Sequence, residues 1–383
     1  MAPSAWVFWA SIACVAYAYV AYPLLVALVA AFRPRPEAPG DRFNGSFSIV
    51  VAAYNEEAAI GRRLDELTRL LASSGRSGEI LVVSDGSTDR TAAIAREHAT
   101  QAVRVIELDT NGGKARAVSL GCAAATGDVL VFADSRQRWD PDALSCLVDN
   151  FARPEVGAVG GELILETDAG VMAGVGLYWR FEKWLRALEA RIHSTVGVSG
   201  SIAAVRRVLF TPIPPGLLLD DVYWPLRVAM QGYRVAFDER ARAYDRLPVD
   251  PRDEFRRKVR TLSGNFQLVS ALPSALLPWR NPLWIQFVSH KLLRLAVPWA
   301  YLAAMVAGAI HGGAFYYLVV TMQAMGLTLA CAGLPGGPLS RSRAASAAAA
   351  VLVLNAAAWL AFWVWASGRA GSSWGKAAYH ADE

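Results

Sequence analysis

The sequence predicts an α/β domain, Rossmann-like with a largely parallel sheet, that lies between transmembrane α-helices. Two observations predict this class. Between residues 47 and 272, short β-branched runs alternate with segments of helical periodicity, which implies right-handed crossovers and a parallel sheet covered by helices on both faces. Apolar residues make up 54% of the 383 residues and charged residues only 19%, a balance that predicts membrane spans.

The central region supplies strands and helices in alternation. We expect a strand over 48–52, a helix over 56–72, a strand over 80–83, a helix over 91–98, a strand over 103–108, a helix from Lys114, a strand over 129–133 and a helix over 141–151. Ligands of such sheets bind at the carboxyl ends of the strands. Asp85 and Asp134 follow two of these strands, so we expect their side chains to converge on one site.

The N-terminal segment 5–32 is uncharged and long enough to cross a bilayer core of about 30 Å. Arg33, Arg35 and Arg42 follow it, and positive charge marks the cytosolic side of a span, so the next domain is expected in the cytosol. A cleaved signal peptide is the alternative interpretation, although no clean cleavage site follows.

Membrane segments return after residue 278. Residues 284–295 mix His290, Lys291 and Arg294 with apolar side chains, which is typical of a helix in the membrane interface. Three further spans are expected over 295–310, 314–334 and 344–366. The predicted organisation is an N-terminal transmembrane helix (1–33), a cytosolic domain (34–275), an interfacial helix (276–294), about three transmembrane helices (295–367) and a tail (368–383).

The positions of positive charge conflict with this count of spans. Arg341 and Arg343 place the loop between the last two spans inside, which leaves the tail outside although it carries Arg369 and Lys376. Either the charge rule is broken here or one segment is re-entrant.

Composition also argues against two other classes of protein. The formal charge of +5 is spread thinly, and no basic helix or RNA-binding aromatic motif is present, so no nucleic acid is expected as a partner. The four cysteines have no paired spacing, which argues against disulfides and zinc.

Asp85 and Asp89 flank a glycine turn at the end of a predicted buried strand. A carboxylate there can accept hydrogen bonds from a uracil N–H or from ribose hydroxyls. The alternative is that Asp85 caps the turn and Asp89 caps the following helix, two positions that aspartate favours.

Three motifs in order decide between these alternatives: VVAAYNEE (50–57), VVSDGSTDRT (82–91) and NGGKARAVSLG (111–121). With them, the chain resembles the family 2 inverting glycosyltransferases of GT-A fold, in the membrane-embedded branch of cellulose, hyaluronan, chitin and poly-N-acetylglucosamine synthases. The resemblance runs from the first span to the interfacial helix. It implies a nucleotide-sugar site in which Asp85 contacts uridine, Lys114 lies near the nucleotide, and the first motif holds base and ribose through Ala53, Tyr54, Asn55 and Glu57.

The fourth motif departs from the family pattern. Where the resemblance implies D-x-D and a divalent cation, Mg²⁺ or Mn²⁺, this chain has Asp134-Ser135-Arg136. Asp134 alone, with water and phosphate oxygens, is one way to hold the cation. Otherwise Arg136 supplies positive charge to the diphosphate directly, since guanidinium pairs well with phosphate.

Two later motifs carry the expected chemistry. LDDVYWPLR resembles the family's T-E-D segment, which implies that Asp221 is the general base, with Asp220 as its acidic neighbour; a capping pair at a helix start is the alternative. RRKVRT resembles Q-x-x-R-W and implies that Arg257 and Arg260 lie at the diphosphate, while Thr261 replaces the family's tryptophan. The resemblance also assigns Ser199, Gly200 and Ser201 to the acceptor site.

The sequence thus predicts a multi-pass inner-membrane glycosyltransferase with a cytoplasmic catalytic domain. It would move a hexose or N-acetylhexosamine from a UDP-sugar to a saccharide or lipid-linked acceptor at the lipid bilayer. Transfer of one sugar to a polyprenyl phosphate is the first alternative, which the loss of the tryptophan favours. A non-catalytic nucleotide-sugar-binding partner subunit is the second, and Arg136 motivates it.

Overall fold

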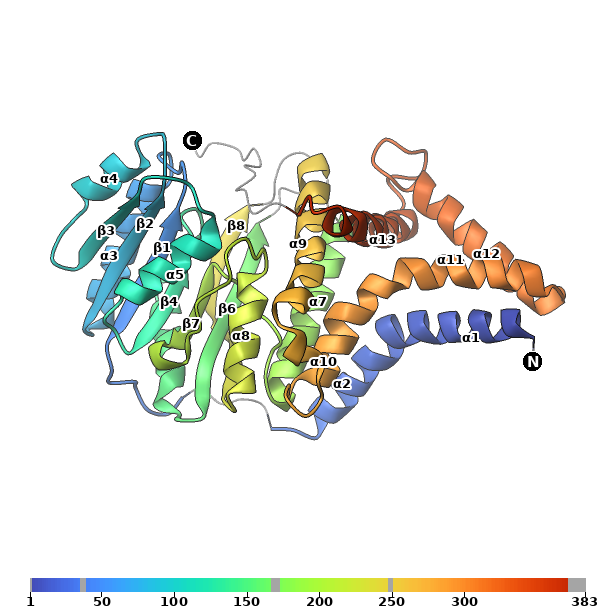
Figure 1. Ribbon diagram of the computed structural model, residues 1–383, viewed down its shortest axis with the longest axis horizontal. Coiled ribbons are helices and arrows are strands. Elements are labelled where there is room, and N and C mark those ends of the chain that lie inside the picture. The colour runs from blue at the N-terminus through green and yellow to red at the C-terminus, as the bar shows by residue number, and fades with distance from the viewer. Residues whose placement is uncertain (1, 35–38, 167–172, 247–250, 371–383) are drawn as a thin grey trace.

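An eight-stranded sheet, built from strands between residues 47 and 246, forms the centre of the domain drawn at the left of Figure 1. The structure is a computed structural model that describes residues 2–34, 39–166, 173–246 and 251–370. The strand order is β3-β2-β1-β4-β7-β6-β8-β5. The strands are β1 (Phe47–Ala53), β2 (Gly78–Asp85), β3 (Val103–Leu108), β4 (Val129–Ala133), β5 (Arg138–Trp139), β6 (Val156–Glu166), β7 (Ile202–Arg206) and β8 (Arg234–Arg246).

The first half of the sheet has the parallel arrangement that the sequence predicts. Strands β3, β2, β1 and β4 run parallel, and β6 runs parallel to β8. Strand β7 is antiparallel to both β4 and β6, and β5 is antiparallel to β8. The predicted α/β class with a largely parallel sheet is confirmed. The sheet is mixed, and the sequence does not predict the strands β5 to β8 of its second half.

Helices cover both faces of the sheet. They are α3 (Ile60–Ser74), α4 (Thr91–Glu97), α5 (Lys114–Ala124), α6 (Ala143–Asp149), α7 (Ala173–Ile192), α8 (Asp220–Met230) and α9 (Pro251–Ala271). Along β1, Ile49 and Val51 pack into one buried cluster with α3 and α6, while Val50 and Ala52 pack into the other with α5 and α8. This alternation buries every residue of the strand.

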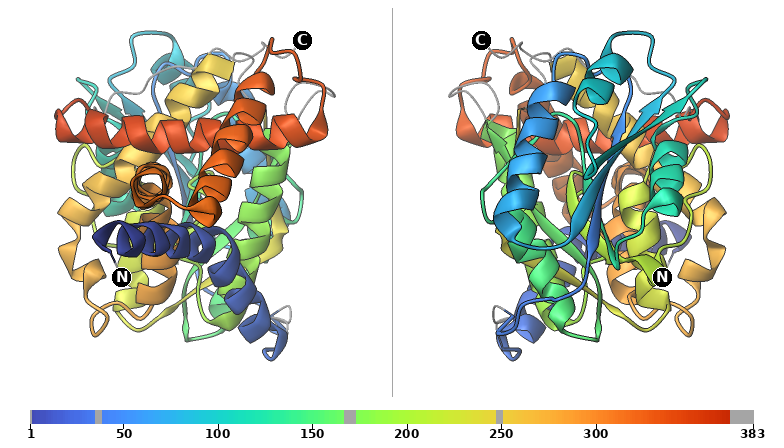
Figure 2. Two further views of the ribbon diagram at one scale, coloured as in Figure 1. Left: turned by 90° about the vertical axis from the view of Figure 1, so that its right-hand side faces the viewer. Right: turned by 90° about the vertical axis from the view of Figure 1, so that its left-hand side faces the viewer.

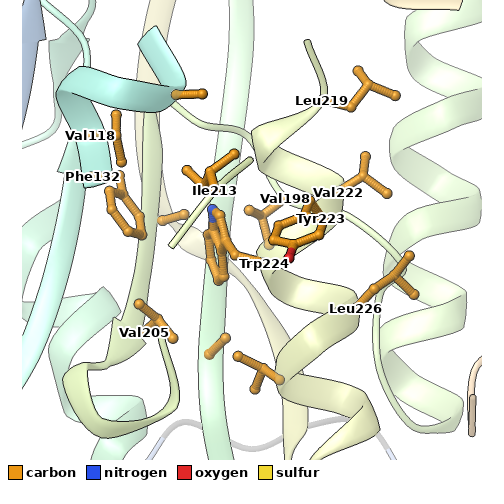
Figure 3. Packing of buried hydrophobic residues seen from close by; sticks show 14 of the residues in the cluster. Val118, Phe132, Val198, Val205, Ile213, Leu219, Val222, Tyr223, Trp224 and Leu226 are labelled. Atoms are coloured by element: carbon orange, nitrogen blue, oxygen red, sulfur yellow. The ribbon is translucent and has the colours of Figure 1, made fainter. Parts of the chain in front are cut away.

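Phe132 and Trp224 meet in the second of these clusters, with ring centroids 5.2 Å apart (Figure 3). Trp224 belongs to α8, and Phe132 immediately precedes the end of β4. Their packing therefore fixes the start of α8 against the carboxyl end of β4, where Asp134 follows.

Four continuous helical segments in the described part of the chain are long and apolar enough to cross a membrane. The first joins α1 (Pro3–Ala16), a π-helical turn (Tyr17–Ala21) and α2 (Tyr22–Ala31). The second joins α10 (Trp284–Gln286), a π-helical turn (Phe287–Leu292) and α11 (Leu293–His311), and α12 (Ala314–Ala332) and α13 (Arg343–Ala366) complete the set. The segment predicted as an interfacial helix is thus continuous with the span that follows it.

Helix α13 runs crosswise to α11. Figure 1 shows α13 nearly end-on while α11 lies across the page, and the left view of Figure 2 shows the reverse. Ala357 and Ala361 of α13 pack against Val259 of α9, and Trp359 stacks on Trp299 of α11 with centroids 3.5 Å apart. Helix α13 therefore joins α9, a helix of the domain that precedes the membrane segments, to α11.

Candidate active site

The first two motifs hold one another in place. The backbone of Asn55 has φ of 53°, and its Oδ1 accepts a hydrogen bond from Thr88 N at 2.7 Å. The carboxylate of Glu57 accepts one from Arg90 N at 3.0 Å. Helix α3 consequently starts at Ile60 and not at residue 56, because the preceding segment is engaged with the turn after β2.

Asp85 is fully buried, and its carboxylate holds the glycine loop before α5. The two oxygens accept hydrogen bonds from Gly112 N at 2.9 Å and Gly113 N at 2.7 Å. Gly86 has φ of 65°, and a Cβ there would overlap the backbone of the same loop. In this structure Asp85 therefore fixes the loop that precedes Lys114, the first residue of α5. A contact between Asp85 and a nucleotide stays a prediction.

Lys114 lies at the centre of three carboxylates. Its Nζ donates to Asp134 Oδ1 at 2.7 Å, and both side chains are about 70% buried. Burial by itself lowers the pKa of Lys114, but the charges of Asp134, Asp220 and Asp221 outweigh it and raise that pKa. Gly200 lies between them, since a Cβ there would be 3.4 Å from Lys114 Nζ and 3.6 Å from Asp221 Cβ. Residues distant in sequence thus meet at one point.

Asp220 and Asp221 open α8, where both are close to other acidic groups. Burial and then the charge of Asp220 raise the pKa of Asp221 to about 7, while Lys114 opposes the shift. Burial also raises the pKa of Asp220, with Asp134 adding to it and Lys114 opposing it. A carboxyl group with a pKa near neutrality can take up a proton and release it under physiological conditions.

Asp221 also faces a cavity of about 340 Å³ between the sheet domain and the helices α7, α9, α11 and α13. Of the predicted acceptor residues, Ser199 lines this cavity, and its Oγ lies 2.9 Å from Oγ of Ser201. Arg257 lines it as well, 2.8 Å from Glu254, and so does Thr261. The small site around Lys114 and the larger cavity are therefore adjacent, with Asp221 at their junction.

Two of the predicted arginines lie at the edges of the site. Arg260, exposed on α9, is close enough to Asp220 for their charges to interact. Arg136 forms an ion pair with Glu56 at 3.4 Å. It is thus turned to the first motif.

The predicted metal ligand Asp134 is engaged by Lys114 instead. Within the described ranges, no group of three or more His, Cys, Asp or Glu side chains is placed to hold a metal ion. The protein thus supplies Asp134 as one hard oxygen ligand, and a divalent cation here requires most of its remaining ligands from a bound diphosphate and water.

A buried ionic network, which the sequence does not predict, lies beside the cavity. His290 contacts Glu182 through Nε2 at 2.7 Å and Glu189 through Nδ1 at 2.9 Å. Tyr22 of the first membrane segment donates to Glu189. Burial by itself raises the pKa of Glu182, but His290 and the neighbouring Lys291 and Arg294 hold it well below its usual value. The signal was the polar stripe of α7, where residues 182, 186 and 189 share a face.

The chain is similar to known glycosyltransferases. Residues 48–210 match the family described as Glycosyl transferase family 2. The chain is 23% identical over 288 residues to the poly-beta-1,6-N-acetyl-D-glucosamine synthase of Staphylococcus aureus strain COL, covering 72% of this chain and 67% of that one. It is 38% identical over 137 residues to the dolichyl-phosphate beta-glucosyltransferase of Drosophila melanogaster, covering 32% of this chain and 42% of that one.

A solved structure has the same fold over most of the chain. The mannosyltransferase PcManGT from Pyrobaculum calidifontis, in complex with GDP-Man and Mn²⁺, matches with a TM-score of 0.68 and 23% sequence identity. The match covers 91% of this chain and 98% of that one. At this level of identity the likeness establishes the fold alone.

Proposed function

Because the chain carries a glycosyltransferase family 2 domain and is a glycosyltransferase, we propose that it is a membrane-bound inverting enzyme with a UDP-sugar as its donor. It transfers a hexose or N-acetylhexosamine to a hydroxyl of a saccharide acceptor, in the synthesis of an exopolysaccharide or cell-surface glycan. The domain lies on the cytoplasmic side of the inner membrane, held there by the apolar helices.

Asp221 is the observation that carries the proposal. Its carboxyl group joins the Lys114 site to the large cavity and has a pKa near 7. An acceptor hydroxyl in the cavity gives its proton to Asp221 while its oxygen attacks the anomeric carbon from the side opposite the departing UDP. Asp220 raises the basicity of Asp221 through its charge, which is the role we assign to it.

The donor would lie along the carboxyl ends of β1, β2 and β4. The loop of Ala53, Tyr54, Asn55 and Glu57 would hold the base and ribose, with Asp85 fixing the glycine loop beneath. Lys114, Arg257 and Arg260 would balance the negative charge that builds on the diphosphate as it leaves.

We propose Mg²⁺ or Mn²⁺ as the cofactor, and a solved structure of this fold contains Mn²⁺. Asp134 would hold the cation, and Arg136 would stay with Glu56 or turn to the diphosphate. Such a cation neutralises part of the diphosphate charge. Lys114 would then have to give up Asp134, and its two remaining carboxylate neighbours are Asp220 and Asp221.

A single transfer to a polyprenyl phosphate is the second candidate. Thr261, which lines the cavity, offers no ring face on which a growing sugar chain could stack. One similar protein is named for action on dolichyl phosphate. A phosphate oxygen is already ionised and needs no general base, so the two candidates differ in how far they depend on Asp221.

The test is UDP or GDP release from a panel of nucleotide sugars by the full chain in membranes, with and without Mn²⁺. For transfer to a hydroxyl, Asp221→Asn should lower kcat by roughly 10²–10⁴-fold and leave the donor KM nearly unchanged. Asp142→Asn is the matched control, because Asp142 is exposed and its side chain makes no capping hydrogen bond to α6. Transfer that survives Asp221→Asn would favour the polyprenyl phosphate, and donor binding without release by the wild type would indicate a non-catalytic partner subunit.

A further inference from the structure

The cavity beside Asp221 carries an excess of positive charge. Six lysine and arginine side chains line it, against three carboxylates. The cations are Lys183, Arg186, Arg257, Lys258, Lys291 and Arg294, and the carboxylates are Glu182, Asp221 and Glu254. Glu162, which pairs with Lys183 from outside the lining, adds a fourth negative charge and leaves the excess in place.

Five of the six cations are already committed to carboxylates. Lys183 pairs with Glu162. Glu254 takes Arg257 at 2.8 Å and Lys258 at 3.1 Å. Glu182 takes Arg294 at 2.8 Å and Lys291 at 3.4 Å. These pairs form the wall of the cavity and are not available to balance a further charge without rearrangement.

Arg186 is the exception. In the part of the chain that the structure describes, it forms no ion pair or hydrogen bond, although it is half-buried and lines the cavity. It lies on α7 one turn after Glu182, on the face that is turned to the cavity. Asp221 lines the same cavity, and the charge of Arg186 partly opposes the rise that burial causes in the pKa of that carboxyl, so the two groups face the same space.

An arginine in a half-buried site is satisfied best by a planar or tetrahedral anion, and phosphate accepts two of its N–H groups at once. Asp221, a base, is needed only where the attacking group is a hydroxyl and not a phosphate oxygen. A ligand that satisfies both groups therefore carries a phosphate and, a short distance away, a hydroxyl.

The walls of the cavity indicate where such a ligand comes from. Lys291 and Arg294 belong to the segment that continues into α11, and Leu354 belongs to α13, two of the helices that are apolar enough for a membrane. A molecule with its apolar part among these helices would place its polar end in the cavity. This combination of charge and surroundings describes a lipid.

Building on the function proposed above, we propose that the acceptor is the headgroup of a phosphate-bearing membrane lipid. Its phosphate pairs with Arg186, and its sugar or polyol hydroxyl reaches Asp221. The hydroxyl proton passes to Asp221, the oxygen forms a bond to the anomeric carbon, and the bond from that carbon to UDP breaks, with the electron pair leaving on UDP.

Lipid binding to the purified full chain in detergent, followed by native mass spectrometry, tests the phosphate directly. The lipids are phosphatidylinositol, phosphatidic acid and an uncharged glucosyl diacylglycerol, with soluble inositol phosphate as the non-lipid competitor. Both phosphate-bearing lipids should bind at least tenfold more tightly than the uncharged one, and inositol phosphate should compete only weakly. Equal binding of the uncharged lipid overturns the proposal, and full competition by inositol phosphate assigns the site to a soluble phosphate.

Two charge-matched variants on α7 locate the site. Arg186→Gln should abolish the preference for phosphate-bearing lipids, whereas Arg180→Gln, at an exposed position on the same helix, should leave it intact. Unchanged preference in Arg186→Gln overturns the assignment. Because binding is read without turnover, a failure of nucleotide release in the wild type would count against the proposed function alone, and normal release with no lipid preference would count against this inference alone.

Discussion

Removing the charge of Lys114 should move the pH dependence of the reaction. Lys114 Nζ and Asp221 Cβ both lie within 3.6 Å of the point where a Cβ of Gly200 would be, so they are no more than about 7 Å apart. The carboxylate charge lies beyond Cβ, and at an effective dielectric constant of about 20 two charges about 7 to 9 Å apart interact by about 2 kcal/mol, equivalent to between one and two pKa units.

Lys114→Met should therefore raise the pKa of Asp221 from about 7 into the range of about 8 to 9. Because the base must be ionised, kcat at pH 7 and saturating donor should fall roughly 5- to 50-fold and recover by about pH 9.5. Asp220→Asn should do the opposite, since it removes the neighbouring charge that raises the pKa of Asp221.

The measurement is kcat for nucleotide release between pH 5.5 and 9.5 for the wild type and both variants, with thermal unfolding to verify that each is folded. Saturating donor is essential, because Lys114 is also proposed to contact the diphosphate. Acid limbs that coincide in all three proteins, whatever the change in absolute rate, would refute Asp221 as the titrating base.

Three further substitutions test the local structure by thermal unfolding of the purified chain. Asp85→Ala should cost about 1–4 kcal/mol, since it leaves the buried N–H of Gly113 and the half-buried N–H of Gly112 without an acceptor, and an unchanged unfolding temperature would contradict this role. Gly86→Ala should destabilise far more than Gly75→Ala, because both glycines have positive φ but only the first would overlap other backbone; equal losses would show that the turn can adjust. Asp221→Asn should stabilise the chain at pH 8 but not at pH 4, since a carboxyl whose pKa rises on folding costs stability only above its unfolded pKa of about 4. The same gain at both pH values would argue against the raised pKa.

The parallel half of the fold was predictable because its strands and helices are each marked by local hydrophobic periodicity. The strands β3 and β4 begin and end where their β-branched runs do. The mixed half was not predictable, because β6 contains three glycines and β8 contains many charged residues, and the pairing of both strands is set by neighbours distant in sequence.

The order of the motifs was sufficient to predict that Asp134 and Asp221 lie at one site. Asp134 directly follows β4, and Asp221 lies at the start of α8. Motif order does not predict that the carboxylate of Asp85 accepts hydrogen bonds from Gly112 and Gly113. A carboxylate that holds a loop and one that binds a ligand can have the same local sequence. Nor could motif order place Glu182 beside His290, since that contact joins a helix of the domain to a membrane segment 108 residues later. The polar stripe on α7 indicates that this face is engaged, but nothing in the periodicity indicates which distant segment contacts it.

Because α13 runs crosswise to α11, its orientation affects the side of the membrane on which the C-terminal end of the chain lies. If α11 follows the bilayer normal, α13 lies flat among the headgroups and does not traverse the hydrocarbon. The described part of the chain would then make an odd number of passes, with α12 returning to the side of the membrane from which α11 starts. In that arrangement Arg369, which follows α13, would lie on the same side as the catalytic domain, and the distribution of basic residues would no longer conflict with the count of spans.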